Sequence, residues 1–282
     1  IGARALLPDG PELERMLETA ECALYADLYA ALPRSLARRH GIRLERRGPE
    51  LRFTASGIDH PFFNRVMGIG LVPGRLHAPG AAWVDGHVRH YERAGVRRWM
   101  LQLLPQVQTP TLRHAMETRG LVALRGWAKH LGAPLADTTV DTDLVVREVD
   151  ARTLDAWIAI CAEGFGVPAE LAPWFAALHG RHGWRLYVAC DGSEPVACAA
   201  LHHRGRMATL TFAATKPAAR RRGAQTALIV RRLLDAKALG CPYVLSETDE
   251  PLPDEPNPST NNLVRLGLDV RYVRANWGPP KP

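Results

Sequence analysis

The fold of this protein is decided by the stretch Lys216-Pro-Ala-Ala-Arg-Arg-Arg-Gly-Ala-Gln-Thr-Ala-Leu-Ile229. Residues 208–215, just before it, are small, β-branched or aromatic, which is typical of a β-strand. Beyond it, apolar residues recur at helical spacing as far as Gly240, a residue suited to the end of a helix. The stretch is therefore predicted to be a basic turn that joins a strand to a helix beginning near Ala224.

This turn has the composition of an anion-binding site. A helix N-terminus offers unpaired backbone N–H groups and a partial positive charge, which suit a phosphate. Gly223 lets the backbone approach a ligand closely, and the arginines at 220–222 raise the local positive potential. Pro217 rigidifies the exit from the strand. We therefore expect an anion site, although arginine-rich turns can also simply face solvent.

The turn resembles motif A of the GNAT superfamily of N-acetyltransferases, Arg/Gln-x-x-Gly-x-Gly/Ala, whose loop amides bind the pyrophosphate of acetyl-coenzyme A. Arg220, Gly223 and Gln225 fall on its defined positions, although Gln225 departs from the small residue expected there. The resemblance implies acetyl-coenzyme A or another acyl-coenzyme A as co-substrate, and no metal. It implies that the cofactor is bound by Phe212, Ala213, Ala214, Thr215, Arg220, Arg221, Arg222, Gly223, Ala224, Gln225, Thr226 and Asn262.

Asn262 is included among these cofactor-binding residues because it resembles an asparagine that some family members direct toward the cofactor. The alternative is that Asn262 faces water at the start of a helix capped by Ser259.

Length and composition favour an ordinary soluble protein with two domains. The chain has 282 residues, of which 46% are hydrophobic and 23% charged. No apolar run approaches the roughly 20 residues that span a bilayer, and no signal-peptide pattern opens the chain. The five cysteines form no Cys-x-x-Cys pair, which argues against a metal site. We expect a cytoplasmic protein with reduced thiols, no membrane partner, and a monomeric or homodimeric state.

The net charge of +7 is compatible with a nucleic acid or with an anionic cofactor. The basic residues are spread along the chain and are not interleaved with aromatic residues, as they would be on a base-stacking surface. The charge pattern therefore argues against nucleic acid.

The two halves of the chain show the same order of predicted helices and strands. A similar stretch lies near the end of each half: Thr118-Arg-Gly-Leu-Val122 in the first and Arg265-Leu-Gly-Leu-Asp269 in the second. This order resembles a tandem GNAT protein. It implies an α/β (α+β) fold class: two GNAT-like domains, each a mixed, mainly antiparallel twisted sheet flanked by helices. We expect domains at 1–140 and 141–282, joined by a linker at 137–143. Residues 71–80 lack the Arg-x-x-Gly pattern, so the first copy is expected to be degenerate and to have no cofactor loop.

Acyl transfer to an amine requires removal of a proton from the amine and delivery of a proton to the departing thiolate. The tyrosine that often serves the superfamily as acid is replaced by Leu263. Glu247, which ends a predicted strand, is the first candidate base; the alternative interpretation is that its side chain is only solvated. His202 is the second candidate base; the alternative interpretation is that it only lies at the end of a β-hairpin. Tyr272 is the candidate acid or, alternatively, a packed aromatic residue.

Glu163 lies in the segment that would cover the acceptor site, and it is expected to hold a cationic substrate. The leading hypothesis is direct transfer of an acetyl or other acyl group from acyl-coenzyme A to an amine of a small molecule or peptide. Backbone N–H groups of 212–214 would polarise the thioester carbonyl. One alternative is a non-catalytic acyl-coenzyme A sensor or scaffold. Another is a different reaction of an acyl thioester, such as decarboxylation or hydrolysis.

Overall fold

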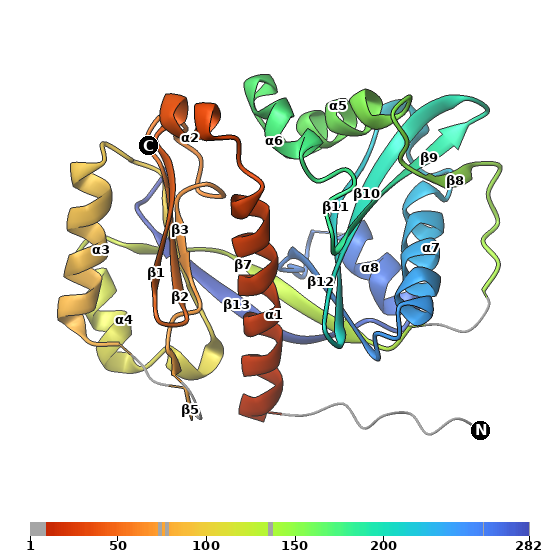
Figure 1. Cartoon of the computed structure of the whole chain (residues 1–282). Coiled ribbons are helices and arrows are strands. Elements are labelled where there is room, and N and C mark those ends of the chain that lie inside the picture. The colour runs from red at the N-terminus through yellow and green to blue at the C-terminus, as the bar shows by residue number, and fades with distance from the viewer. Residues whose placement is uncertain (1–9, 73–74, 77–78, 135–137, 256, 282) are drawn as a thin grey trace. The chain divides into compact units, whose positions relative to one another are not determined.

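The chain forms two compact units in the computed structural model, which describes residues 10–72, 75–76, 79–134, 138–255 and 257–281 (Figure 1). Unit 1 consists of residues 1–128 and 272–282, and unit 2 of residues 129–271. Compared with the expected division after residue 140, residues 129–140 belong to unit 2 and residues 272–282 belong to unit 1. The unit boundaries fall inside two strands, β7 (Val122–Gly132) and β13 (Asp269–Gly278). Residue 137 of the expected linker lies outside the described residues.

Unit 1 is built on a mixed sheet whose strands follow the order β1-β2-β3-β6-β13. The pairs β1–β2, β2–β3 and β6–β13 are antiparallel, whereas β3 and β6 are parallel. Its helices and strands are α1 (Gly10–Ala30), α2 (Arg34–His40), β1 (Ile42–Arg47), β2 (Glu50–Ala55), β3 (Arg65–Met67), β4 (Leu71–Val72), β5 (Arg75–Leu76), α3 (Ala81–Arg93), β6 (Met100–Leu103), the 3₁₀ turn η1 (Pro105–Val107) and α4 (Pro110–Glu117).

Unit 2 is built on a sheet whose strands follow the order β8-β9-β10-β11-β12, with β7 beside β12. The pairs β8–β9, β9–β10 and β10–β11 are antiparallel, whereas β11 and β12 are parallel. Its further elements are β8 (Val145–Glu148), α5 (Leu154–Phe165), η2 (Ala169–Leu171), α6 (Ala172–Ala176), β9 (Trp184–Asp191), β10 (Glu194–Arg204), β11 (Met207–Thr215), η3 (Pro217–Ala219), α7 (Ala224–Ala238), β12 (Tyr243–Asp249) and α8 (Pro258–Arg265).

The two units share one topology. In each, an antiparallel pair leads to a strand that pairs in parallel with a later strand after a crossover helix. The crossover helix is α3 in unit 1 and α7 in unit 2. The expected fold class, mixed and mainly antiparallel sheets flanked by helices, is therefore confirmed.

Local sequence signals account for several element boundaries. Pro33 separates α1 from α2, as expected from its fixed φ and missing N–H. Thr109 caps α4, and its hydroxyl accepts from the Leu112 amide at 3.2 Å. The expected cap of α8, Ser259, is wrong: Asn257 caps this helix and accepts from the Thr260 amide at 3.1 Å.

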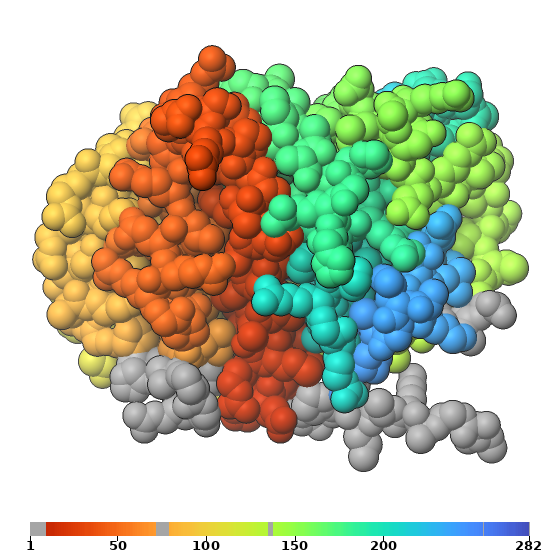
Figure 2. All heavy atoms as spheres, viewed as in Figure 1, coloured from red at the N-terminus to blue at the C-terminus, as the bar shows by residue number. Residues whose placement is uncertain are grey.

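The sheet of unit 2 is covered on both faces. The helix α7 packs Leu228 and Leu233 into a buried cluster with Leu210 and Val244, and this cluster forms the core on one face. On the other face α5 packs against β10 and β11, with Trp157 fully buried (Figure 1). The surface of α5 and α6 is visible in green in Figure 2. The strand β11 therefore lies between two helical layers, and its C-terminal end leads into the basic turn.

Candidate active site

The basic turn has the predicted strand–turn–helix geometry. The strand β11 ends at Thr215, and α7 begins at Ala224, as expected. Within the turn, Arg221 and Gly223 have positive φ angles of 64° and 80°. A non-glycine residue in this left-handed region costs roughly 1–2 kcal/mol, so Arg221 is held there by its surroundings.

The amides at the start of α7 are available to a ligand. None of the backbone N–H groups of residues 221–226 donates to an acceptor in the part of the chain that the structure describes. Arg220 and Arg221 are exposed beside them. Unpaired amides together with the positive end of a helix form an anion site, and these residues fit a pyrophosphate.

Arg222 differs from its two neighbours. Its guanidinium is bound by Asp191, 2.5 Å from its Nη1, and by Asp143, and these hydrogen bonds raise the pKa of Arg222. The Thr142 hydroxyl donates to the Arg222 carbonyl at 2.6 Å. The Arg222 guanidinium therefore anchors the turn, and the part of Arg222 predicted to bind the cofactor is narrowed to its backbone N–H.

Gly223 and Gln225 also secure the turn. A Cβ on Gly223 would lie 3.1 Å from both the Asp141 carbonyl and the Thr142 Cβ, so only glycine combines this φ with this packing. Gln225 donates from Nε2 to the Thr215 hydroxyl at 2.8 Å and so joins the two ends of the turn. This bond gives a reason for the glutamine at a position where motif A has a small residue.

A β-bulge interrupts β11 just before the turn. Thr211 pairs with Ala200 and Ala214 pairs with Cys198, so two residues of β11 stand opposite the single residue Ala199. The first of them, Phe212, has a positive φ of 49°.

The two parallel strands of unit 2 separate close to this bulge. The pairing of β11 with β12 ends at Leu210 and Ser246, although β11 continues to Thr215 and β12 to Asp249. The open edges of the two strands are the place that the family resemblance implies for the pantetheine arm and the thioester.

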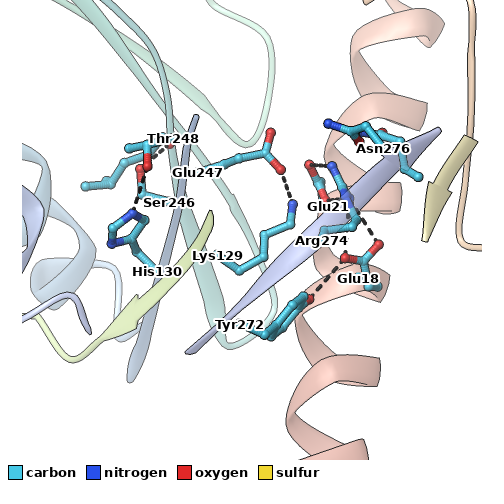
Figure 3. A network of polar contacts seen from close by, with 12 residues as sticks. Glu18, Glu21, Lys129, His130, Ser246, Glu247, Thr248, Tyr272, Arg274 and Asn276 are labelled. Atoms are coloured by element: carbon cyan, nitrogen blue, oxygen red, sulfur yellow. Dashed lines mark hydrogen bonds and ion pairs between the residues drawn. The ribbon is translucent and has the colours of Figure 1, made fainter. Parts of the chain in front are cut away.

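Glu247 lies one residue beyond the last β11–β12 pair. Val244 packs in the core with α7, so strand alternation places Glu247 on the opposite face, the face of α5. Its carboxylate forms an ion pair with Lys129 of β7, whose side chain is 1% exposed (Figure 3). The alternative that Glu247 is a solvated residue is wrong. Lys129 was not a candidate, because 118 residues separate it from Glu247.

Residues 128–245 match the family model described as "Acetyltransferase (GNAT) domain". The chain contains a GNAT acetyltransferase domain. The matched segment runs from the end of β7 into β12, and it includes the bulge and the basic turn. The match supports acyl-coenzyme A-dependent acyl transfer as the general activity of this domain.

Solved structures of GNAT proteins share the fold over most of the chain. A GCN5-related N-acetyltransferase from Kribbella flavida is 15% identical, with a TM-score of 0.60, over 90% of this chain and 96% of the other. A GCN5-related N-acetyltransferase from Sphaerobacter thermophilus is 14% identical, with a TM-score of 0.59, over 94% of both chains. A tandem GNAT protein from the clavulanic acid biosynthesis pathway is 14% identical, with a TM-score of 0.56, over 85% of both chains. No curated protein matches the sequence.

One face of the GNAT domain is aromatic around the bulge. Phe212 has ring contacts with Phe165 at 6.2 Å, Phe175 at 5.6 Å and Trp184 at 6.1 Å. Phe165 is 44% exposed, and no local sequence pattern marks it as a site residue. It resembled an ordinary apolar residue at a helix end, and only its contact with the bulge distinguishes it.

Glu163 lies close to this aromatic group. It is exposed at the C-terminal end of α5, next to Gly164, where a Cβ would come within 2.4 Å of the Ala214 Cβ. The end of α5 therefore touches the open end of β11. The substrate-binding role of Glu163 stays a prediction.

His202 lies away from the bulge of the GNAT domain. It is 4% exposed, its ring lies 4.8 Å from that of Trp184, and it pairs with Thr209. Thr209 is three residues before Phe212, which corresponds to roughly 10 Å along a strand. The structure therefore argues against His202 as the base, because the acyl group would lie beyond the bulge.

Tyr272 belongs to unit 1. Its hydroxyl donates to Glu18 at 3.0 Å, and burial raises its pKa well above the usual value. In the same cluster Arg274 binds Glu18 and Glu21 (Figure 3). The assignment of Tyr272 as acid is corrected, because its proton is engaged in the interior of unit 1 and the high pKa makes it a weak donor.

Asn262 lies on α8, and its side-chain oxygen accepts from Arg265. The inner side of α8 takes part in a buried chain of hydrogen bonds that no sequence pattern indicated. Thr260 and Thr248 are joined through their hydroxyls at 2.8 Å, and Thr248 contacts His130 Nε2 at 3.0 Å. Burial lowers the pKa of His130, so its ring is neutral and links β7 to β12 and α8.

The five cysteines are buried, and none of them forms a disulfide in the described residues. Among the described residues, no group of three or more His, Cys, Asp or Glu side chains is arranged to hold a metal ion. No helix in the described part of the chain has the length and apolar character needed to cross a membrane.

Proposed function

We propose that the GNAT domain transfers an acetyl or other acyl group from acyl-coenzyme A directly to an amine of a small molecule or peptide. The observation that carries this proposal is the set of unpaired amides at 221–226, which follows directly after a bulged strand with an open edge. The protein then offers its phosphate-binding and acyl-binding parts in the order that coenzyme A requires. The pyrophosphate lies at the start of the helix, and the thioester lies at the strand.

The amides of 221–226 would bind the pyrophosphate, and Arg220 and Arg221 would add charge from the surface. Backbone N–H groups of 212–214 would stabilise the negative charge that develops on the thioester carbonyl oxygen. Because these donors are backbone groups, their positions depend on the geometry of the bulge and not on any side chain of β11.

The acceptor amine would approach from the face of α5. In this arrangement Glu163 attracts the ammonium form of the acceptor at the surface, and Phe165 contacts its apolar part. Glu247 removes the proton, directly or through a water molecule, before the amine attacks the carbonyl carbon. Lys129 orients the Glu247 carboxylate, although a neighbouring ammonium also weakens a carboxylate as a base.

Unit 1 is proposed to bind no coenzyme A. Its corresponding segment, between β3 and α3, has no Arg-x-x-Gly pattern, and residues 73–74 and 77–78 of it lie outside the described residues. Titration calorimetry should give one coenzyme A per chain. A stoichiometry of two would contradict this part of the proposal.

The function is tested with acetyl-coenzyme A and a panel of small amines, amino acids, aminoglycosides and peptides. Free thiol is measured together with the product mass. A mass increase of one acetyl group on an amine, matched by thiol release, is the expected result. Coenzyme A binding without thiol release would favour the sensor, and thiol release without an acylated amine would favour hydrolysis or decarboxylation.

A further inference from the structure

Arg232 of α7 is a buried cation in the core of unit 2. It is 2% exposed, and no carboxylate in the described residues forms an ion pair with it. Burial lowers its pKa to about 10, so it still carries its charge at neutral pH. A buried cation without a carboxylate is costly, and an apolar side chain of similar size would normally be at least as stable. Stability alone therefore does not explain an arginine here.

The hydrogen bonds of Arg232 lead to the bulge. Its Nη1 donates to the carbonyls of Ala200 at 3.1 Å and Thr211 at 3.4 Å. These two residues form the last regular pair of β10 and β11 before the bulge. Its Nε donates to the Leu228 carbonyl of its own helix at 2.9 Å, which fixes the direction of the side chain. Arg232 therefore connects α7 to the point at which β11 departs from regular pairing.

The other side of the bulge is held independently. Trp157 of α5 donates from Nε1 to the Ala199 carbonyl at 2.9 Å, and Ala199 is the residue opposite the bulge. The Cys198 thiol donates to the Phe212 carbonyl at 3.5 Å. Both helical layers thus contribute a buried donor to the same few peptide groups.

We propose that Arg232 is a positioning residue that fixes the bulge and so aims the backbone N–H groups of 212–214 at the thioester carbonyl. This inference rests on the proposed acyl transfer. A hydrogen bond to the Thr211 carbonyl also polarises the Thr211–Phe212 peptide group, which makes the Phe212 N–H a stronger donor. Arg232 does not touch the substrate, and it acts through the backbone.

The test compares Arg232→Met with Arg231→Met. Arg231 is the preceding residue on α7, is 35% exposed, and pairs with Asp235 at 3.1 Å, so it controls for the loss of an arginine from this helix. In Arg232→Met, kcat should fall by about 10–100-fold, since the oxyanion donors lose their alignment. The KM for acetyl-coenzyme A should stay within about threefold because the amides of 221–226 are unchanged. Arg231→Met should retain both values.

Stability and a conservative variant separate positioning from folding. The thermal midpoint of Arg232→Met should not fall, because methionine fills the core without a buried charge. Arg232→Lys keeps a donor and should recover part of kcat. If Arg232→Met does not fold, Arg232→Leu, which also lacks a donor, is measured in its place, and a kcat equal to the wild type would overturn the inference. An unchanged kcat in Arg232→Met, or an equal loss of kcat in Arg231→Met, would also overturn the inference.

A wild-type protein that acylates no amine would refute the proposed function and not yet this inference. In that case the rate of amide hydrogen exchange at residues 212–214 decides whether Arg232 positions the bulge. Exchange at least tenfold faster in Arg232→Met than in Arg231→Met would support the positioning role. Equal exchange in the two variants would refute it.

Discussion

The two units place a polar pair at the same point of the same topology, but with different charge. In unit 1, Gln102 is one residue beyond the last β3–β6 pair, and its amide donates to Asn276 at 3.1 Å. In unit 2, Glu247 is one residue beyond the last β11–β12 pair, and it is paired with Lys129. The unit with the basic turn thus has an ionised pair where the other unit has two neutral amides.

The arginines differ between the units in the same way. Arg65 of β3 is fully buried, with its guanidinium 3.9 Å from the ring centroid of Tyr25, and its three nitrogens have no hydrogen-bond acceptor among the described residues. Arg220 and Arg221 of unit 2 are exposed beside unpaired amides. A shared topology therefore does not imply a shared role, because the cation serves packing in one unit and is exposed beside unpaired amides in the other.

Glu247→Gln should give the largest effect, since it gives unit 2 the neutral amide found in unit 1. If Glu247 removes the proton from the amine, the transfer rate should fall by about 10²–10⁴-fold, while coenzyme A affinity stays within a few-fold. Steady-state rates and calorimetry measure the two quantities. His202→Ala is the control and should retain most of the rate; a normal rate in both variants would leave proton removal to solvent.

Arg274→Ala should destabilise the protein strongly. Arg274, Glu18 and Glu21 have side chains 0%, 1% and 4% exposed, so the variant removes a buried positive charge from beside two buried carboxylates. We expect a loss of about 3–5 kcal/mol in the free energy of unfolding, measured by urea denaturation. Arg222→Ala is the matched control, because Arg222 also binds two carboxylates but at the surface of unit 2. Its loss should hardly change stability, and an equal loss would contradict the importance of burial.

Gly223→Asp should weaken coenzyme A binding by about 100-fold or more, because a negative charge enters a phosphate site and a side chain is forced into the left-handed region. Gly80, which precedes α3 in unit 1, is the control. It has a φ of −93°, and no atom of the described residues lies within 4 Å of its missing Cβ. Calorimetry on Gly80→Asp should return the wild-type affinity. Unchanged affinity in Gly223→Asp would remove the turn from the cofactor site.

Lowering the pH should produce the smallest effect, a decrease in the free energy of unfolding. Burial lowers the pKa of His130 in unit 2 and lowers that of His90 in unit 1 to about 4. In the unfolded chain a histidine titrates near pH 6.5, so below this pH the unfolded state binds more protons and stability falls. From pH 7.5 to 5.5 each histidine should cost at most about 1.4 kcal/mol. Urea titrations of His90→Gln and His130→Gln should show a smaller pH dependence than the wild type; an unchanged dependence would mean that other groups cause it.

Much of the site was predictable because its signals are local. A strand followed by a proline, three arginines and a glycine identified the turn and the first residue of α7. Local signals also mark helix boundaries at Pro33, which precedes α2, and at Thr109, which caps α4. Each of these depends on the backbone within a few residues, so a linear pattern is sufficient.

The proton-handling residues were harder to predict because their roles depend on distant partners. Glu247, His202 and Tyr272 were selected from their positions along predicted strands. The structure gives Glu247 an ion pair with Lys129, places His202 three residues before the bulge, and engages Tyr272 with Glu18. None of these relations follows from spacing, since each partner comes from another strand or helix.

The amino-acid sequence alone was sufficient to predict the class of fold, the repeated topology and the basic turn between a strand and a helix, because periodicity, caps and glycine positions act over short distances. Tertiary structure decided which arginine anchors the turn, which carboxylate is paired, and where β11 bulges. It also decided the extent of each unit, since residues 272–282 pack with unit 1. These features depend on the burial of charges and on strand register between segments far apart in the chain, and such interactions leave no local pattern in the sequence.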